Sequence, residues 1–408
     1  MSSTITTKFT ITDGGITKPQ GFTAGGLHCG IKKNRPDLAW CYSQVPAVSA
    51  GVYTENIFKA APLIVNQESI GIEHKTQAVL VNSGVANACT GHQGLQDAYE
   101  MQRILAAKFK IPQHYAAIAS TGVIGTRLPL ENIARGVDRI TNWDQSKEFE
   151  QFEQAIMTTD LAPKRVSVEL IIDNKVVTIG GAAKGSGMIN PNMATMLAFI
   201  TTDAAVDQES LEQLLKQVTE ATFNMIAVDG DTSTNDMVLA LANGLAGNSV
   251  LSPSHLEWDK FAAAFSYAAR ELAKKIAQDG EGATKLIEVT VNNAVDITQA
   301  RIISKTIIMS NLVKTAIFGA DPNWGRIVCA IGYSKQPLDP DLVQIKLGPI
   351  TVFQAGVPVQ FNKAAAVKYM QQSTVTINVD LGLGAYSATA WGCDLTYDYV
   401  KINAEYST

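Results

Sequence analysis

The chain has 408 residues, of which 46% are hydrophobic and 17% are charged, a balance typical of a folded protein with core for two or three domains. Its 33 basic and 38 acidic residues give a net charge of -5 without a long run of either sign, which argues against a nucleic-acid-binding surface. The five cysteines are scattered, no segment approaches a membrane span, and no secretory signal is visible, so we expect a cytoplasmic protein.

The first half of the chain predicts strands followed by helices. Residues 1–94 are typical of strands and glycine-rich loops. Apolar residues at helical spacing then predict helices over residues 95–109 and 130–140. Two strands are expected within residues 164–185, joined by the turn-prone pair Asp173-Asn174.

The second half alternates helices and strands. Amphipathic helices are predicted over residues 207–226 and 256–280. The remaining elements are a strand at 286–292, a helix at 297–319, a strand at 326–334, a mostly β run at 342–359, a helix at 362–372 and a strand at 373–382. Strands interleaved with long helices predict a layered α/β fold.

Three features of the sequence are candidates for cofactor, metal or catalytic sites, and none has the required spacing. In GGAAKGSG, Lys184 precedes Gly185, whereas a nucleotide-binding loop needs lysine directly after its last glycine. The stretch DGDTSTND, residues 229–236, lacks the glycine of a calcium loop and has Ala240 where the bidentate glutamate belongs, which favours an Asx-rich turn. The five histidines are scattered and predict neither a zinc site nor a Ser-His-Asp arrangement.

The stretch GSGMINPNMATMLAFITTDA, residues 185–204, sets a hydroxyl at Thr195 behind a glycine-rich approach and the small residue Ala194. A threonine hydroxyl is a weak nucleophile, but an N-terminal threonine carries its own base in an α-amine with a pKa of about 8. An internal threonine reaches that state when its Oγ attacks the preceding carbonyl and the peptide bond is cut. The stretch fits both an ordinary strand start and self-cleavage between Ala194 and Thr195.

The same junction closely resembles that of the ornithine acetyltransferase family, the glutamate N-acetyltransferases of arginine biosynthesis. The resemblance extends over nearly the whole chain in seven further blocks: VNSGVANACTG, STGVIG, AIMTTD, VDGDTSTND, IAQDGEGATKLIEV, FGADPNWGRI and NAEYST. It implies a layered α/β sandwich of the self-cleaving N-terminal-nucleophile, or amidohydrolase-like, type. It also implies an α chain of residues 1–194 and a β chain of residues 195–408, which remain associated as an α2β2 heterotetramer. Within the β chain, we expect a C-terminal α/β subdomain from about residue 286.

The activity that the resemblance implies is transfer of the acetyl group of N2-acetyl-L-ornithine to L-glutamate through an acetyl-threonine. Ornithine and N-acetylglutamate would be the products, and the reaction would need no cofactor and no metal. The implied partners are these small substrates and the protein's own two chains, without nucleic acid or membrane. The sequence leaves open whether acetyl-CoA is a second acetyl donor, how large the oligomer is and whether feedback inhibition occurs.

The resemblance also implies roles for individual residues. Thr195 would be the nucleophile, with its freed α-amine as the base, and Thr121 and Gly122 would form the oxyanion hole. Lys184 would face the substrate α-carboxylate and Glu281 the δ-ammonium of the donor. The complete set of implied substrate contacts is Thr158, Lys184, Thr195, Glu281, Asn403 and Thr408, with Thr158 preferred over the adjacent Thr159 on the family's register.

Two alternatives remain open at the level of sequence. A self-cleaving aminopeptidase or amidase of related architecture would use the same acyl-threonine and pass the acyl group to water. An uncleaved homologue would bind a metabolite without catalysis. Free acetate as the product would favour the first alternative, and acetylglutamate would favour the acetyltransferase. An intact chain on a denaturing gel would support the second alternative.

Overall fold

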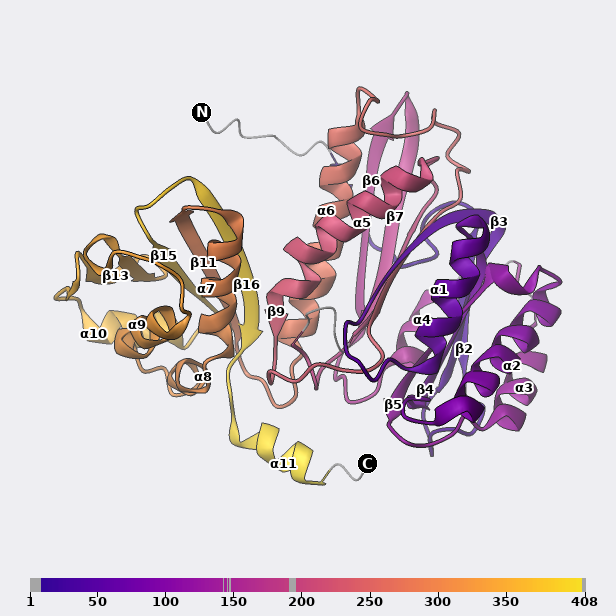
Figure 1. Cartoon of the computed structure of the whole chain (residues 1–408), viewed down its shortest axis with the longest axis horizontal. Helices are drawn as coiled ribbons and strands as arrows, with labels where there is room; N and C mark the ends of the chain where they lie inside the picture. Colours follow the sequence, from indigo (N-terminus) through magenta and orange to yellow (C-terminus); the bar gives the residue numbers. More distant parts are fainter. Residues whose placement is uncertain (1–8, 142, 145, 147, 191–195, 406–408) are drawn as a thin grey trace.

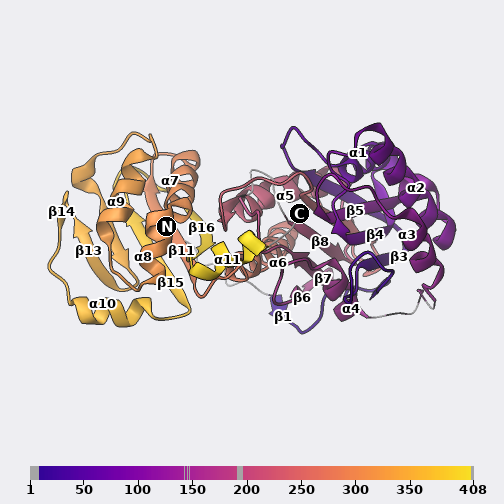
Figure 2. The ribbon, with the colours of Figure 1, turned by 90° about the horizontal axis from the view of Figure 1, so that it is seen from below.

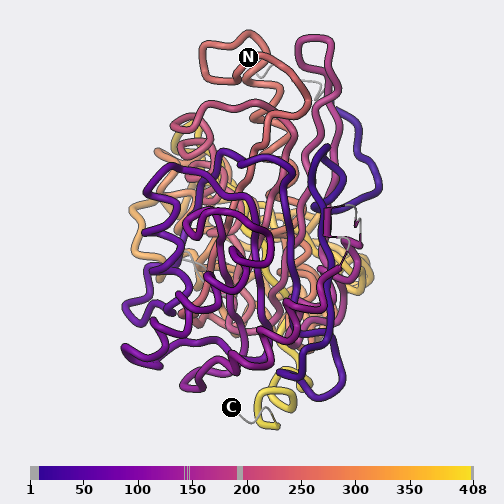
Figure 3. The backbone as a smooth tube through the Cα atoms, turned by 90° about the vertical axis from the view of Figure 1, so that its right-hand side faces the viewer, coloured from indigo at the N-terminus to yellow at the C-terminus, as the bar shows by residue number. Residues whose placement is uncertain are grey.

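The computed structural model describes residues 9–141, 143–144, 146, 148–190 and 196–405. Figure 1 shows two lobes side by side, a larger one drawn from indigo to salmon and a smaller one in orange and yellow. Viewed from the side of the larger lobe, the orange and yellow lobe lies behind it (Figure 3). The predicted layered α/β fold is confirmed, because each lobe packs helices on a sheet.

Nine described strands form the sheet of the larger lobe, in the order β1-β6-β7-β8-β10-β3-β4-β5, with β2 paired to β3. Their bounds are β1 Phe9–Ile11, β2 Phe22–Leu27, β3 Leu38–Tyr53, β4 Lys75–Val85, β5 Ala116–Val123, β6 Lys164–Ile172, β7 Lys175–Lys184, β8 Leu197–Thr202 and β10 Met237–Ala242. The helices of this lobe are α1 Ala61–Glu73, α2 Gly91–Phe109, α3 Leu130–Asp138, α4 Phe149–Ile156, α5 Gln208–Ala221 and α6 Trp258–Gln278.

The centre of this sheet is apolar on both faces. In β8, Leu197 and Phe199 belong to the core on the α4 side, while Ala198 and Ile200 belong to the core on the α5 and α6 side. Successive side chains of a strand point to opposite faces, so the unbroken apolar run LAFI needs a layer of helices on each side. The ring of Phe199 meets Phe152 of α4 with 5.6 Å between centroids.

The second sheet, in the smaller lobe, has the order β14-β13-β12-β15-β11-β16-β9 in the described residues. Its strands are β9 Ile226–Ala227, β11 Leu286–Ala294, β12 Gln344–Leu347, β13 Ile350–Gln354, β14 Val357–Pro358, β15 Thr374–Asp380 and β16 Tyr386–Cys393. The helices here are α7 Ile297–Met309, α8 Asn311–Phe318, α9 Trp324–Tyr333 and α10 Lys363–Met370, and α11 Tyr397–Glu405 follows β16. Short 3-10 turns occupy Gln113–Tyr115, Phe223–Met225 and Pro340–Leu342.

Helix α6 joins the two lobes. Its buried residues include adjacent pairs that recur every four residues from Ala264-Phe265 through Leu272-Ala273, and this spacing widens the apolar stripe of the helix. One side of α6 lies on β6 and β7 and another meets β16 and β9, so one continuous core runs through both lobes. Seen from below, α11 lies between the lobes (Figure 2).

Three sequence predictions of secondary structure are wrong. Residues 61–73, expected among strands and loops, form α1, where buried Asn66 and Ser69 interrupt the apolar periodicity. Of residues 326–334, expected as a strand, all but the last belong to α9, which Asn323 caps and which buries Ile327, Ala330 and Ile331 at helical spacing. The single helix expected over 297–319 is two helices, because the Ser310 hydroxyl accepts from Val313 N and starts α8.

The sheet of the larger lobe contains segments from both sides of the expected cleavage point. Strand β7 ends at Lys184, β8 begins at Leu197, and these two residues are paired in register. In the smaller lobe, β11 begins at Leu286, where the C-terminal subdomain is expected to start. Strand β9 belongs to the same sheet but precedes that residue in the chain. Within the described part of the chain, no helix combines the length and the apolar character that crossing a membrane requires.

Candidate active site

A cavity of about 260 Å³ opens where the carboxyl ends of β5 and β7 meet the loop after α6 and the helix α11. Its lining includes all the described residues that were predicted for the site: Thr121, Gly122, Thr158, Lys184, Glu281 and Asn403. Thr159 lines it as well, so the choice of Thr158 over Thr159 stays a prediction. The other predicted residues, Ala194, Thr195 and Thr408, lie outside the described residues.

Thr121 and Gly122 lie at the end of β5, where the backbones of two strands touch. Gly122 has φ 131° and is paired with Gly84 of β4. A Cβ at Gly122 would lie 2.3 Å from the carbonyl carbon of Gly84, so only glycine fits. The close approach fixes the position of the neighbouring Thr121 side chain at the cavity wall.

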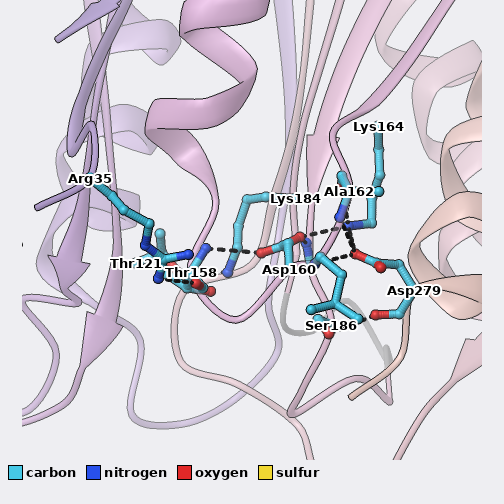
Figure 4. Close-up of polar contacts among 11 residues, drawn as sticks. Arg35, Thr121, Thr158, Asp160, Ala162, Lys164, Lys184, Ser186 and Asp279 are labelled. Carbon is cyan, nitrogen blue, oxygen red and sulfur yellow. Dashed lines mark hydrogen bonds and ion pairs between the residues drawn. The ribbon is translucent and has the colours of Figure 1, made fainter. Parts of the chain in front are cut away.

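Lys184 is the last residue of β7, and its ammonium is buried beside Thr121. Lys184 Nζ donates a hydrogen bond of 2.9 Å to Thr121 Oγ1 (Figure 4). Burial lowers the pKa of Lys184, and the Asp160 carboxylate is the strongest of the neighbouring charges that oppose this. When Lys184 is charged it can only donate, so the Thr121 hydroxyl proton remains available to another acceptor.

Asp160 connects the segments that carry Thr158 and Lys184. Its Oδ2 accepts from Thr158 N at 2.9 Å, and its Oδ1 accepts from Gly185 N at 2.6 Å. Lys164 Nζ lies 2.7 Å from Oδ1 of the same carboxylate. Burial alone would raise the pKa of Asp160, but the charges of Lys164 and Lys184 hold it well below its usual range.

Lys164 continues this contact to the loop after α6. Its Nζ lies 2.6 Å from Asp279 Oδ2, and both partners are shielded from solvent. Ser186 Oγ donates to Asp279 O at 2.6 Å, and Glu281 N donates to Ser186 O at 3.1 Å. Figure 4 shows the contacts that run from Thr158 through Asp160 and Lys164 to Asp279. The loop that carries Glu281 is thus held by Lys164 at the start of β6 and by Ser186 just after β7.

Glu281 and Asn403 also line the cavity. Asn403 Nδ2 of α11 donates to Glu281 Oε2 at 2.8 Å. The Glu281 carboxylate packs against Gly187, where an added Cβ would lie 2.3 Å from the carboxyl carbon. Gly187, the last residue of the KGSG stretch, therefore makes room for the acid, and the cavity lining includes both a lysine and a glutamate.

Residues 23–408 match the model of the ArgJ family. This chain belongs to the ArgJ family. It is 53% identical over 396 residues to the arginine biosynthesis bifunctional protein ArgJ of Oceanobacillus iheyensis, covering 97% of each chain. It is 52% identical to the protein of the same name from Geobacillus kaustophilus, over 98% of this chain and 97% of that one. A crystal structure of the ArgJ protein of Bacillus halodurans is 51% identical, with a TM-score of 0.51, and its whole chain covers 52% of this one.

In this ArgJ chain, the DGDTSTND stretch holds the approach to the predicted cleavage point. The Asp229 carboxylate accepts from Met188 N at 2.6 Å and from Ile189 N at 2.9 Å. It also accepts from Asp231 N, which is the Asx-type turn expected from the sequence. The described residues contain no group of three or more His, Cys, Asp or Glu side chains that could hold a metal ion.

Sequence reasoning missed several polar residues in and behind the wall of the candidate site. Asn235 lines the cavity and donates to Ala86 O and Ser120 O, which ties the ends of β4 and β5 to the DGDTSTND stretch. Asp160 and Asp279 were missed as well, although they stand in the AIMTTD and IAQDGEGATKLIEV blocks. Their position inside those blocks was the available signal, because spacing alone does not show which acids become buried.

Proposed function

We propose that this protein is a glutamate N-acetyltransferase that moves the acetyl group of N2-acetyl-L-ornithine to L-glutamate through an acetyl-threonine at Thr195. The observation that carries the proposal is the shared cavity in which Thr121, Lys184 and Glu281 meet. Its size suits a small amino acid derivative better than a drug-sized ligand. The names of the Oceanobacillus and Geobacillus relatives agree with a reaction of arginine biosynthesis.

The first half-reaction forms the acetyl-enzyme. The Thr195 α-amine takes the proton of the Thr195 hydroxyl, and Oγ attacks the acetyl carbonyl carbon of acetylornithine. Negative charge develops on the carbonyl oxygen, where the Thr121 hydroxyl and the Gly122 amide donate hydrogen bonds. The C–N bond then breaks, the proton passes to the departing α-nitrogen, and ornithine leaves with the acetyl group held as an ester.

The second half-reaction reverses these steps with glutamate. The neutral α-amine of glutamate attacks the ester carbonyl carbon, the C–Oγ bond breaks, and the proton returns to Thr195 Oγ. Both substrates have an α-carboxylate, for which Lys184 supplies the positive charge. Glu281 faces the δ-ammonium of the donor, and Asn403 and Thr408 accommodate the side-chain carboxylate of the acceptor, which Glu281 would repel.

Self-cleavage between Ala194 and Thr195 makes the base available. It would separate the protein into an α chain of residues 1–194 and a β chain of residues 195–408 within an α2β2 assembly. A solved relative whose whole chain corresponds to 52% of this chain supports a division near the middle. The sheet pairing of Lys184 with Leu197 supports continued association, because cleavage leaves β7 and β8 hydrogen-bonded.

Steady-state kinetics test the shared-site mechanism. With acetylornithine and glutamate varied together, double-reciprocal plots should give parallel lines, as expected when one product leaves before the second substrate binds. Acetylglutamate should accumulate and free acetate should not. Intersecting lines would require a ternary complex and contradict the acetyl-enzyme mechanism, while acetate as the main product would favour an amidase.

Acetyl-CoA is the second acetyl donor that we propose, which would make the protein bifunctional. The same Thr195 ester would form from the thioester, with coenzyme A as the leaving group in place of ornithine. Formation of acetylglutamate from acetyl-CoA and glutamate by the purified protein supports this donor. Activity with acetylornithine alone would restrict the protein to the ornithine-dependent reaction.

Glu281→Gln should weaken the acetylornithine half-reaction more than the glutamate half-reaction. The amide keeps the size of the side chain and can still accept from Asn403, but it loses the charge that faces the δ-ammonium. A hydrogen bond to a charged group contributes about 1.5–3 kcal/mol, so KM for acetylornithine should rise about tenfold or more. Acetyl-enzyme formation followed by intact mass measures this step, and an unchanged KM would remove Glu281 from donor recognition.

A further inference from the structure

A buried carboxylate outside the predicted site holds the cavity wall together. Asp160 is 3% exposed and accepts hydrogen bonds from Thr158 N, Gly185 N and Lys164 Nζ, at 2.9, 2.6 and 2.7 Å. Thr158 is itself a predicted substrate contact, and Gly185 directly follows another, Lys184. A carboxylate with several donors stays charged when buried, so Asp160 supplies a fixed negative charge to this region.

The direction of the hydrogen bond between Lys184 and Thr121 depends on whether Lys184 is charged. Charged Lys184 donates to Thr121 Oγ1 at 2.9 Å, and the Thr121 hydroxyl then directs its own proton elsewhere. Neutral Lys184 has a lone pair, and this lone pair would accept the Thr121 proton instead. An oxyanion can use the Thr121 hydroxyl only in the first arrangement, so the protonation of Lys184 decides whether the donor is available.

Several charged groups act on Lys184, and Asp160 is the most effective acid among them. The groups near it are Asp160, Asp236, Lys164, Glu281 and Lys32. Burial raises the pKa of Asp236 well above its usual range, so that carboxyl gives less negative charge. The pKa of Asp160 is held low, and its charge opposes the effect of burial on Lys184 most strongly.

We propose that Asp160 is a positioning residue for acetyl transfer, because its carboxylate, bonded to Gly185 N directly beside Lys184, favours the arrangement in which the Lys184 ammonium donates to Thr121 and the Thr121 hydroxyl is free to donate to the oxyanion. The inference rests on the proposed function, since it assigns Thr121 to the oxyanion of that reaction. It adds a residue that touches neither substrate nor the reacting atoms. A purely structural role would change stability and would leave the pH dependence of the reaction in place.

The test is the pH profile of acetyl-enzyme formation from acetylornithine, followed by intact mass in single turnovers. In the wild type, the rate should fall at alkaline pH as Lys184 loses its proton. Asp160→Asn removes the negative charge and lowers the pKa of Lys184, so this fall should move to lower pH by about one unit or more. Lowering the pH should restore much of the rate, because it protonates Lys184 again.

Asp203→Asn is the matched control. Asp203 is also 3% exposed and accepts from two backbone amides, Thr178 N at 2.7 Å and Gln20 N at 2.9 Å. Thr178 lies six residues before Lys184 on β7, which places it about 20 Å away at strand spacing. This variant should lose stability in a thermal melt while its alkaline limb stays where it is in the wild type.

A second variant covers the case in which Asp160→Asn does not fold. Asp160→Asn with Lys164→Met removes both members of the buried pair and leaves no unpaired ammonium. Its alkaline limb should still move to lower pH, because Asp160 affects Lys184 more strongly than Lys164 does. An unmoved limb in the folded variant would overturn the role of Asp160. A wild type that forms no acetyl-enzyme would instead overturn the proposed function.

Discussion

Thr195→Ala is expected to leave the protein as one uncut chain of 43.7 kDa that transfers no acetyl group. The substitution removes the only atom of that side chain able to attack the Ala194 carbonyl, so neither the peptide bond nor the substrate is attacked. Without cleavage, the α-amine that serves as the base does not form. Loss of a nucleophile that acts as a unit with its base typically costs about 10⁴-fold or more in rate. Intact mass and an acetylglutamate assay measure the two effects separately.

Thr195→Ser is the control for this prediction. Serine keeps the hydroxyl and, after cleavage, the adjacent α-amine, so this variant should still be cut and should keep part of the activity. Full cleavage of Thr195→Ala would show that another group cuts the chain. Full activity of an uncut Thr195→Ala would contradict the whole acetyl-threonine mechanism and support a different nucleophile.

Regular periodicity made parts of the fold predictable. The paired apolar positions of α6, and the two apolar runs of β6 and β7 on either side of the Asp173-Asn174 turn, indicate their structure locally, and both were predicted. Helix α9 was predicted as a strand because RIVCAIGYS is rich in β-branched residues, and its helical form depends on packing and on the Asn323 cap. In α1, buried polar residues obscure the period in a similar way.

The candidate site was predictable where a motif carried it and unpredictable where only the fold brings residues together. Thr121 and Lys184 are 63 residues apart, and their resemblance to family blocks placed both in one site before their contact was visible. Lys164 and Asp279 are 115 residues apart, and no local pattern joins them. A single sequence does not say which of its 38 acids become buried, so Asp160 emerges only when its three donors are seen around it.

Thr121→Val is expected to lower kcat by about 100-fold or more, with little change in the fold. Valine has nearly the same shape as threonine but cannot donate a hydrogen bond to the tetrahedral oxygen. Gly122 remains as the second donor, so the reaction should be slowed and not abolished. Lys184 also loses its acceptor at 2.9 Å. A free ammonium still attracts a substrate carboxylate, so KM should change less than kcat.

Thr202→Val separates this effect from the general cost of losing a buried hydroxyl. Thr202 is 1% exposed at the far end of β8, and its Oγ1 donates to Thr178 O at 2.8 Å. Losing that bond should cost stability of about 1–3 kcal/mol without altering kcat. If Thr121→Val and Thr202→Val lose equal stability but only the first loses rate, the hydroxyl of Thr121 acts in the transition state. An unchanged kcat in Thr121→Val would leave Gly122 as the sole proposed donor. It would also contradict the role proposed for Asp160, which acts through Lys184 on the Thr121 hydroxyl.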